Sequence, residues 1–201
     1  VWQLRPMPFA SRLRIGLTTR IASMWARGLV FMTTEQCEQA KRFVRNRVPV
    51  IKLKCGVDTR FYQTPANDCD IPEEQKKTVE ELMQRPFVVC MGDQLRDDKA
   101  LLDILKRSGL TCARILQDPQ RAAWLRLEAK ASKLSDRLFV FEKISYRLVR
   151  FLLQHAKAYA GLVDSTWQPA GWTTTCEALA SGLPSILYDG LAARELLEVG
   201  A

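Results

Sequence analysis

The fourteen residues Gly171 to Pro184, GWTTTCEALASGLP, decide the fold of this chain. Gly171 lets the backbone approach a ligand closely, and the threonines after it can cap a helix whose first N–H groups point outward. Glu177 lies one turn into that helix among small apolar residues, where a carboxylate needs a partner. Gly182 ends the helix, and Pro184 opens the next strand. The stretch predicts either an ordinary capped helix or a nucleotide-diphosphate site in which Glu177 binds ribose hydroxyls.

Strand and helix signals alternate on the N-terminal side of this stretch and beyond it. Short apolar runs predict strands at 29–32, 48–53, 87–91, 112–116, 138–141, 158–163 and 185–188. Helical segments follow at 34–46, 72–84, 99–108, 120–133, 146–156 and 191–199, besides the helix of the opening stretch. Such alternation with short links predicts an α/β fold, a Rossmann-like parallel sheet with helices on both faces. Ligands of such sheets bind at the carboxyl ends of the strands.

A polar link, residues 63–70, is the best domain boundary. We therefore expect residues 1–62 and residues 63–201 to belong to different domains. Within the link, Asp68-Cys69-Asp70 resembles an Asp-x-Asp metal motif. It does not follow an apolar strand, so we interpret it as linker.

The composition excludes several classes of protein. The 201 residues contain no uncharged apolar run of about 18 residues, so no membrane-spanning helix is expected, and the start of the chain lacks the apolar core of a signal peptide. The six cysteines form no Cys-x-x-Cys pair, which disfavours zinc and disulfides and predicts reduced thiols in a cytoplasmic protein. The only histidine, His155, falls near a helix end, where a capping role is usual.

The positive charge is concentrated at the start. Residues 1–60 hold 12 Lys/Arg and 3 Asp/Glu, whereas the remainder is nearly balanced. Within 9–27, Leu13, Leu17, Ile21 and Trp25 recur every fourth residue between arginines. This pattern predicts either a helix on an anionic membrane surface or a core-facing helix with a charged back. Nucleic acid is not an expected partner, because no aromatic-basic platform accompanies the charge.

The loop after strand 87–91 offers cations at the mouth of the sheet. Gly92-Asp-Gln-Leu-Arg-Asp-Asp-Lys99 places Arg96 and Lys99 beside the next helix start. A pyrophosphate needs cations together with backbone N–H donors, which this loop supplies. The alternative is a solvated charged loop in which Asp97 and Asp98 cancel part of the charge.

Three blocks resemble retaining GT-B glycosyltransferases of the family-4 type. Residues 50–61, VIKLKCGVDTRF, resemble the inter-domain segment of that family, and residues 92–99 resemble its phosphate loop. Residues 171–184 resemble its donor motif, G-x-x-x-x-E-A-x-A-x-G-x-P. The resemblance covers about residues 48–190 and implies the donor-nucleotide half of a two-domain enzyme. It implies that residues 1–62 are a short remnant of the preceding, acceptor-side domain and that residues 63–201 are a nucleotide-sugar-binding domain truncated at its end.

The resemblance also implies roles for particular residues. Glu177 matches the acid that holds the ribose, and Arg96 and Lys99 match the cations facing the diphosphate. The other positions implied to line the donor are Gly171, Thr173, Thr174 and, near the base, Lys143. Members usually need no metal or other cofactor, because a helix dipole and basic side chains stabilise the departing diphosphate.

Catalytic residues are not predicted. The family's first glutamate is missing, with Gln168 near its place, and Asp93 stands where many members carry an arginine. The expected function is transfer of a sugar from a UDP- or GDP-linked donor to a lipid or glycan acceptor, with retention and without metal. The alternatives are a non-catalytic nucleotide-binding α/β module and, from the basic start, a membrane-surface adaptor.

Overall fold

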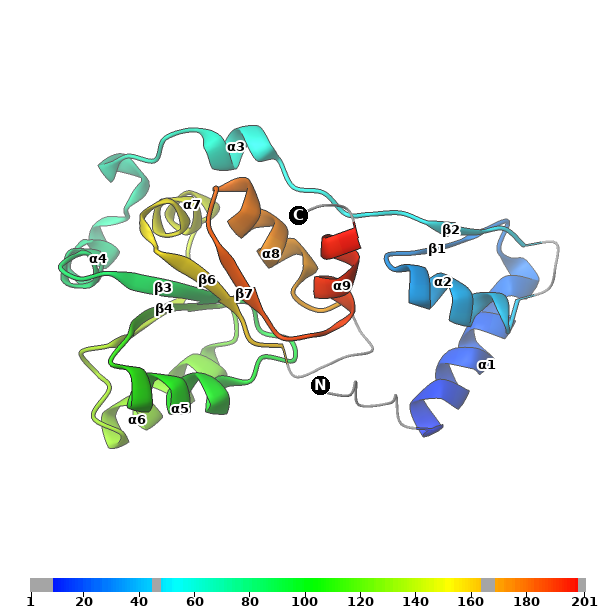
Figure 1. Ribbon diagram of the computed structural model, residues 1–201, viewed down its shortest axis with the longest axis horizontal. Coiled ribbons are helices and arrows are strands. Elements are labelled where there is room, and N and C mark those ends of the chain that lie inside the picture. The colour runs from blue at the N-terminus through cyan, green and yellow to red at the C-terminus, as the bar shows by residue number, and fades with distance from the viewer. Residues whose placement is uncertain (1–8, 45–47, 164–168, 199–201) are drawn as a thin grey trace. The chain divides into compact units, whose positions relative to one another are not determined.

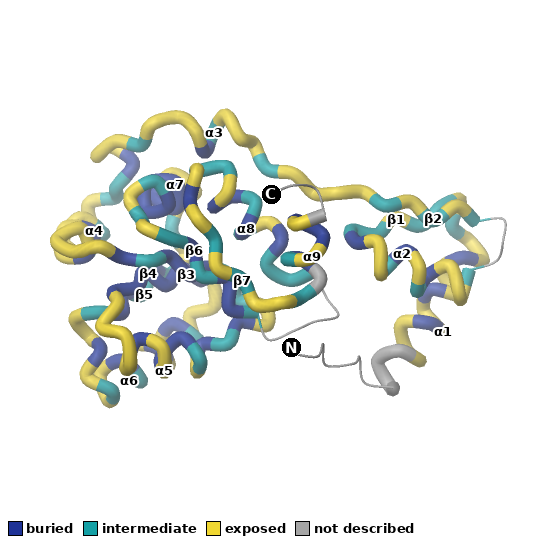
Figure 2. Tube along the Cα trace, in the orientation of Figure 1, coloured by how far each residue is buried: buried dark blue, intermediate teal, exposed yellow. Residues whose placement is uncertain are grey.

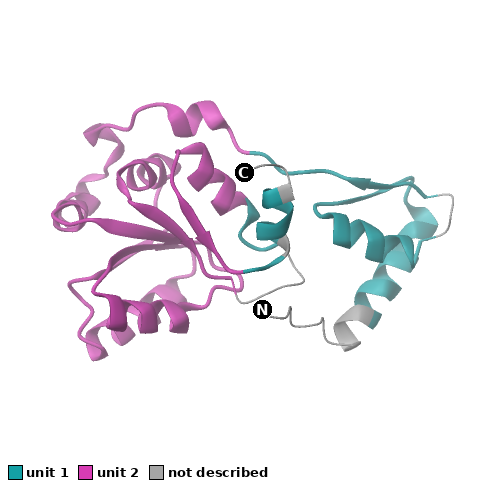
Figure 3. Ribbon diagram, in the orientation of Figure 1, with its two compact units in different colours: residues 1–56, 165–172, 189–201 teal, residues 57–164, 173–188 magenta. Residues whose placement is uncertain are grey.

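The computed structural model describes residues 9–44, 48–163 and 169–198 (Figure 1). It divides into two compact units, which Figure 3 colours separately. Unit 1 comprises residues 1–56, 165–172 and 189–201, and unit 2 comprises residues 57–164 and 173–188.

Unit 2 is built on five parallel strands in the order β5-β4-β3-β6-β7. Their bounds are β3 Phe87–Met91, β4 Thr111–Leu116, β5 Leu138–Glu142, β6 Ala158–Gly161 and β7 Ser185–Leu187. The chain moves outward from β3 to β5 and then returns to the other side of β3. This confirms the predicted Rossmann-like α/β fold and places the reversal of strand order between β3 and β6.

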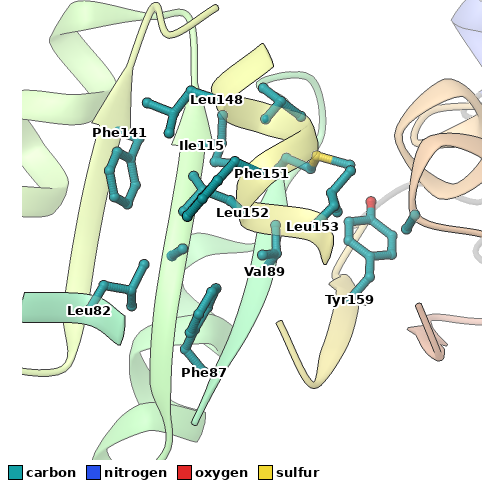
Figure 4. Close-up of a cluster of buried hydrophobic side chains, with 14 of the residues drawn as sticks. Leu82, Phe87, Val89, Ile115, Phe141, Leu148, Phe151, Leu152, Leu153 and Tyr159 are labelled. Atoms are coloured by element: carbon teal, nitrogen blue, oxygen red, sulfur yellow. The ribbon is translucent and has the colours of Figure 1, made fainter. Parts of the chain in front are cut away.

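Helices cover both faces of this sheet. On one face, α5 (Asp98–Ser108) and α6 (Pro119–Ala131) pack on the side chains that alternate strand positions direct toward them, such as Cys112 and Leu116. On the other face, α4 (Glu73–Met83) and α7 (Tyr146–His155) cover a larger apolar cluster, shown in Figure 4, which includes Phe87 and Phe141. Burial on both faces explains why these strands read as continuous apolar runs.

Local signals set the ends of these helices. Asp97, Asp118 and Ser145 each accept a hydrogen bond from a first-turn N–H group and so begin α5, α6 and α7. Gly109, with a φ of +66°, ends α5 in the left-handed conformation. His155 is the last residue of α7, as expected, and its Nδ1 lies 2.8 Å from the carbonyl oxygen of Phe151.

The polar link is ordered by α7. The 3₁₀ turn η1 (Asp68–Asp70) lies within it, and α3 (Thr59–Gln63) ends at its first residue; the sequence predicted neither element. Arg150 Nη2 donates to Asp70 Oδ2 at 2.6 Å, and Gln154 Nε2 donates to the carbonyl oxygens of Tyr62 and Thr64. The whole of α3 therefore groups with unit 2, although the sequence-based boundary after residue 62 cuts through it.

Unit 1 contains a two-stranded parallel sheet, β1 (Leu29–Phe31) with β2 (Val50–Lys52). Helix α2 (Thr34–Lys41) connects them and begins with a capping box between Thr33 and Gln36. Helix α9 (Leu191–Glu198) carries Glu195, whose carboxylate accepts from Lys52 Nζ at 2.6 Å and from the N–H of Thr34. In Figure 2, β1 and β2 are teal and yellow, whereas β3 and β4 contain long dark blue stretches.

Helix α1 (Phe9–Trp25) turns small side chains inward. Gly16, Thr19 and Ser23 are buried, and a Cβ on Gly16 would meet the ring of Phe43 at 2.6 Å. The apolar residues that recur every fourth position are instead exposed: Leu13 63%, Leu17 58%, Ile21 48% and Trp25 83%. Among the described residues, unit 1 therefore does not bury this stripe as a core-facing helix would.

The cysteines carry free thiols. Cys37, Cys90 and Cys112 are buried and Cys176 is half-buried, whereas Cys55 in unit 1 and Cys69 in unit 2 are exposed. Within the described ranges, the helices are all too short or too polar to cross a bilayer.

Candidate functional site

The reversal of strand order brings two chain segments together at the carboxyl ends of β3 and β6. The loop 92–97 follows β3, and helix α8 (Trp172–Ala180) comes after β6 in the chain. Arg96 also forms an isolated antiparallel bridge with Val163, just after β6. Open parallel sheets bind ligands at such a switch point.

Arg96 is the side chain that joins the two segments. Its Nε donates to the carbonyl oxygen of Met91 at 2.7 Å, and its Nη2 donates to Thr174 Oγ1 at 3.0 Å. Its side chain is buried, and Nη1 has no hydrogen-bond partner within the described part of the chain. The guanidinium thus keeps one nitrogen, Nη1, with unused N–H donors in a place where an unpaired buried group is costly.

Gly92 makes this position of Arg96 possible. It has a φ of +100°, and a Cβ there would lie 2.5 Å from Arg96 Nη2. The loop therefore needs glycine at residue 92 both for its backbone conformation and for the space that the guanidinium occupies.

Thr174 links Arg96 to a buried tyrosine. The hydroxyl of Tyr159, on β6, lies 2.8 Å from Thr174 Oγ1. Tyr159 is fully buried and lies at one margin of the apolar cluster in Figure 4, and burial raises the pKa of its hydroxyl. Thr173 is exposed. The first turn of α8 is thus fixed to the loop 92–97 and to β6.

Glu177 lies on the same side of α8 as Thr174, since residues three apart are neighbours on a helix. It is 8% exposed, and burial raises the pKa of its carboxyl, an effect that a hydrogen bond with Tyr62 partly offsets. Burial, followed by the charge of Glu177, raises the pKa of Tyr62. The predicted ribose-binding acid is therefore present as a buried carboxyl with one hydroxyl partner.

The two predicted lysines are exposed and are not part of this cluster of contacts. Lys99 lies in the first turn of α5, adjacent to the loop 92–97. Lys143 follows β5, which is two strands away from β3, or about 10 Å at the usual strand spacing. Its φ is +50°, and its N–H donates to the carbonyl oxygen of Leu116 at 3.0 Å.

Two other positions from the sequence analysis lie outside unit 2. Gly171, with a φ of +85°, belongs to unit 1, where its neighbour Trp172 donates from Nε1 to the carbonyl oxygen of Cys55 at 2.7 Å. Gln168 lies outside the described residues. Of the predicted set, the structure joins Arg96 to Thr174 by a hydrogen bond, and Glu177 follows three residues later on α8.

Sequence reasoning missed several residues of the site and its support. Tyr62 and Tyr159 were not predicted, although a tyrosine among the small residues of β6 was a usable signal. Arg114 was also missed: it is an arginine inside the continuous apolar run of β4, where it requires a buried partner. That partner is Asp98, whose Oδ1 lies 2.8 Å from Arg114 Nε.

The site is suited to binding an anion beside a hydroxyl-bearing group. The dipole of α8 favours negative charge at its N-terminus, and its first turn holds no acidic residue that would oppose an anion there. Arg96 adds a cation, and Glu177 adds a carboxyl that can accept from hydroxyl groups. Across the described ranges, we find no group of three His, Cys, Asp or Glu side chains arranged to hold a metal ion.

No family model matches the sequence. The search of curated proteins also gave no match.

Solved structures do match. The structure is similar to Anabaena HepE in complex with UDP and glucose, with a TM-score of 0.71 and 15% identity over 92% of this chain and 50% of that one. Trehalose 6-phosphate synthase from Burkholderia multivorans gives a TM-score of 0.66 and 16% identity over 96% and 52%. Sucrose-phosphate synthase from Thermosynechococcus elongatus gives 0.65 and 16% over 89% and 44%.

These similarities establish the fold. The chain shares the GT-B architecture of these proteins and spans about half the length of each. At 15 to 16% identity the likeness carries no more than the fold, which does not by itself imply function.

Proposed function

We propose that this chain binds a nucleotide-diphosphate sugar and contributes the donor side of a glycosyl transfer reaction. The observation that carries the proposal is the contact between Arg96 and Thr174 at the point where strand order reverses. It places a cation and a helix N-terminus at the same edge of the sheet, with the carboxyl of Glu177 on the same side of α8. The diphosphate would lie against the first two groups and the ribose against the third.

The fold comparisons support the same ligand class. HepE has been solved with UDP and with UDP-glucose, and this chain aligns with it over 92% of its length. Arg96, the dipole of α8 and the exposed Lys99 next to the loop 92–97 would stabilise the departing diphosphate. This is electrostatic stabilisation of the charge that develops on the leaving group. We further propose that transfer proceeds with retention and without a metal ion.

Isothermal titration calorimetry with UDP, GDP and ADP tests binding and identifies the base. The informative variant is Glu177→Gln, which keeps the shape of the side chain and its contact with Tyr62 while removing the charge. We expect it to weaken the preferred nucleotide roughly tenfold, the effect of one charge-assisted hydrogen bond. Glu81→Gln, on the exposed side of α4, is the matched control and should bind as wild type. No binding by wild-type protein would overturn the proposal.

A second candidate is a nucleotide-sugar-binding module without catalysis. It is favoured by the burial of Arg96, whose other donors already bond Met91 and Thr174. Measuring donor hydrolysis beside binding separates the two functions. Binding with no turnover, in the presence or absence of EDTA, would favour the module, whereas turnover unaffected by EDTA would favour metal-independent transfer.

The acceptor and the cellular setting are further proposals. We propose a lipid or glycan acceptor, cytoplasmic location and contact of residues 9–27 with anionic membranes. The exposed stripe of α1, flanked by Arg14 and Arg20, is the feature that suits such a surface. Co-sedimentation with vesicles that increases with anionic lipid content is the expected result.

A further inference from the structure

The loop that carries Arg96 is held from behind by a network of buried charge. Arg114 has 0% exposed surface and lies on the face of the sheet that otherwise presents Cys90, Cys112 and Leu116 to α5 and α6. Its Nε donates to Asp98 Oδ1 at 2.8 Å, and its Nη1 donates to the carbonyl oxygen of Ile115 at 2.8 Å. Because an apolar pair of similar volume would stabilise the fold as well or better, stability alone does not account for this ion pair.

Arg121, on α6, connects this pair to the loop. Its Nε donates to the second oxygen of Asp98, its Nη1 to the carbonyl oxygen of Asp93 and its Nη2 to the carbonyl oxygen of Arg96. One guanidinium thus holds both ends of the four-residue stretch 93–96. A planar fork of donors suits three acceptors in fixed directions, which a lysine ammonium does not match.

The attachment is reciprocal. The carboxylate of Asp93 accepts from the N–H of Gln117 at 3.0 Å and from the N–H of Asp118 at 3.2 Å, where α6 begins. The carbonyls of Asp93 and Arg96 therefore accept from Arg121 of α6, and the Asp93 carboxylate accepts from two N–H groups in the turn that leads into α6. This also gives Asp93 a structural role at the position where the resemblance implied a phosphate-binding arginine.

The loop needs such support because its conformation is strained. Leu95 has a φ of +55°, a left-handed backbone conformation that is unfavourable for leucine. Strained residues persist where surrounding contacts over-determine them, and they concentrate at functional sites. The next residue is Arg96, so the strained turn directly sets the direction in which its guanidinium leaves the backbone.

We propose that Asp98, Arg114 and Arg121, here called the clamp, are positioning residues for the diphosphate site. They hold the loop 92–97 so that Arg96 lies over Gly92 with Nη1 left for the ligand. The clamp acts through Arg96 and does not itself touch the nucleotide. This role rests on the proposed nucleotide binding, although the hold of Arg121 on the loop can be tested without it.

The test compares Arg121→Ala with Arg137→Ala. Arg137 is a matched control because it is also half-buried and donates to a backbone carbonyl, that of Leu105, but it precedes β5 at the opposite edge of the sheet. We expect Arg121→Ala to weaken UDP affinity roughly tenfold in calorimetry, while Arg137→Ala binds as wild type. Amide exchange of residues 93–97 in the free protein should accelerate in Arg121→Ala only.

Chemical rescue separates positioning from general stability. The side chain of Arg121 is 24% exposed, so methylguanidinium at a non-denaturing concentration can reach the space left by Arg121→Ala. We expect it to restore UDP affinity in Arg121→Ala and to leave Arg137→Ala unchanged. Arg121→Lys keeps the charge and serves where the alanine variant does not fold; it should bind UDP more weakly than wild type.

The possible failures are distinguishable. Equal UDP affinity and equal loop exchange in wild type and Arg121→Ala would overturn the clamp and leave the proposed function standing. Wild-type protein that does not bind UDP, GDP or ADP would overturn the proposed function. In that case, unchanged loop exchange in Arg121→Ala would overturn the clamp independently.

Discussion

The two parallel sheets described for this chain are both built from largely apolar strands, but their surroundings differ. In unit 2, β4 is buried at every position, with helices on both faces. In unit 1, the middle residues of β1 and β2, Val30 and Ile51, are 57% and 52% exposed among the described residues. Apolar β-branched residues therefore favour a strand in both places, but only the covered sheet gains the full free energy of burial.

The largest expected effect breaks the covered sheet. Leu152, on α7, is fully buried in the cluster of Figure 4, so Leu152→Ala leaves a cavity. We expect a loss of about 2–5 kcal/mol in the free energy of unfolding, measured by urea denaturation. Leu127, on α6, is 68% exposed, so Leu127→Ala is the control and should change stability by less than about 0.5 kcal/mol. A similar loss in both variants would contradict the burial of Leu152 in the core of unit 2 and the exposure of Leu127.

A second test concerns the buried ion pair of unit 2. Burial alone would raise the pKa of Asp70, but hydrogen bonds from Arg150 and from the N–H of Asn67 outweigh it and lower the pKa. The stabilisation is therefore complete above the unfolded pKa of about 3.9 and is lost as pH falls through the lower folded value. Asp70→Asn should lose about 1–3 kcal/mol at neutral pH and should show a weaker decline in acid.

The control for this pair is Asp136→Asn. Asp136 lies 3.7 Å from Arg85 in an exposed pair, which should contribute less than about 1 kcal/mol. Urea denaturation at several pH values measures both variants. An acid dependence of Asp70→Asn identical to that of wild type would show that Asp70 does not titrate as described.

The pH dependence of stability that is due to Glu177 should be opposite in sign to that of Asp70 and smaller in magnitude. The pKa of Glu177 is raised mainly by burial, so the folded state binds a proton more readily than the unfolded chain. Stability then falls as pH rises from the unfolded pKa of about 4.3 through the higher folded pKa. Above that pH, Glu177→Gln should be more stable than wild type, and in stronger acid the two should be equal. Thermal melts across pH measure the difference, and Glu81→Gln should show none.

The smallest expected effect concerns the sheet of unit 1. Ile51→Thr keeps the β-branched shape on a half-exposed strand position and should change stability by less than about 0.5 kcal/mol. Amide exchange of residues 29–31 and 50–52 reports this unit separately from unit 2. A loss above about 1 kcal/mol would show that this face of the sheet is covered in solution. Sedimentation of wild type and variant would then show whether self-association covers it.

The sequence was sufficient for the elements of unit 2 because their signals are local. Continuous apolar runs predicted β3 to β7, and a side-chain cap begins each of α5, α6 and α7. The short α3 was missed because a five-residue helix is too short to show a periodic apolar face. The resemblance correctly indicated the GT-B fold, and the donor-site assignments stay predictions.

The arrangement within the site could not be read from the sequence because it depends on distant pairs. Arg96 lies in a polar loop whose sequence suggests exposure. It is nevertheless buried, because Gly92 leaves room for it and Thr174, 78 residues later, accepts its hydrogen bond. The alternative of a solvated charged loop had Asp98 cancel part of the charge of nearby cations. Asp98 is instead the partner of Arg114 and Arg121, and only the packing of α5 and α6 on one face brings these three together.

The positions of the cysteines would allow the distance between a point in unit 1 and a point in unit 2 to be measured. Two of the six thiols are exposed, Cys55 in unit 1 and Cys69 in unit 2, while three others are buried. In a Cys176→Ser variant, which removes the half-buried thiol, a nitroxide reagent of limited reactivity would thus label one cysteine in each unit. Pulsed electron paramagnetic resonance would then give the label-to-label distance distribution with and without a nucleotide, and no cysteine would have to be introduced.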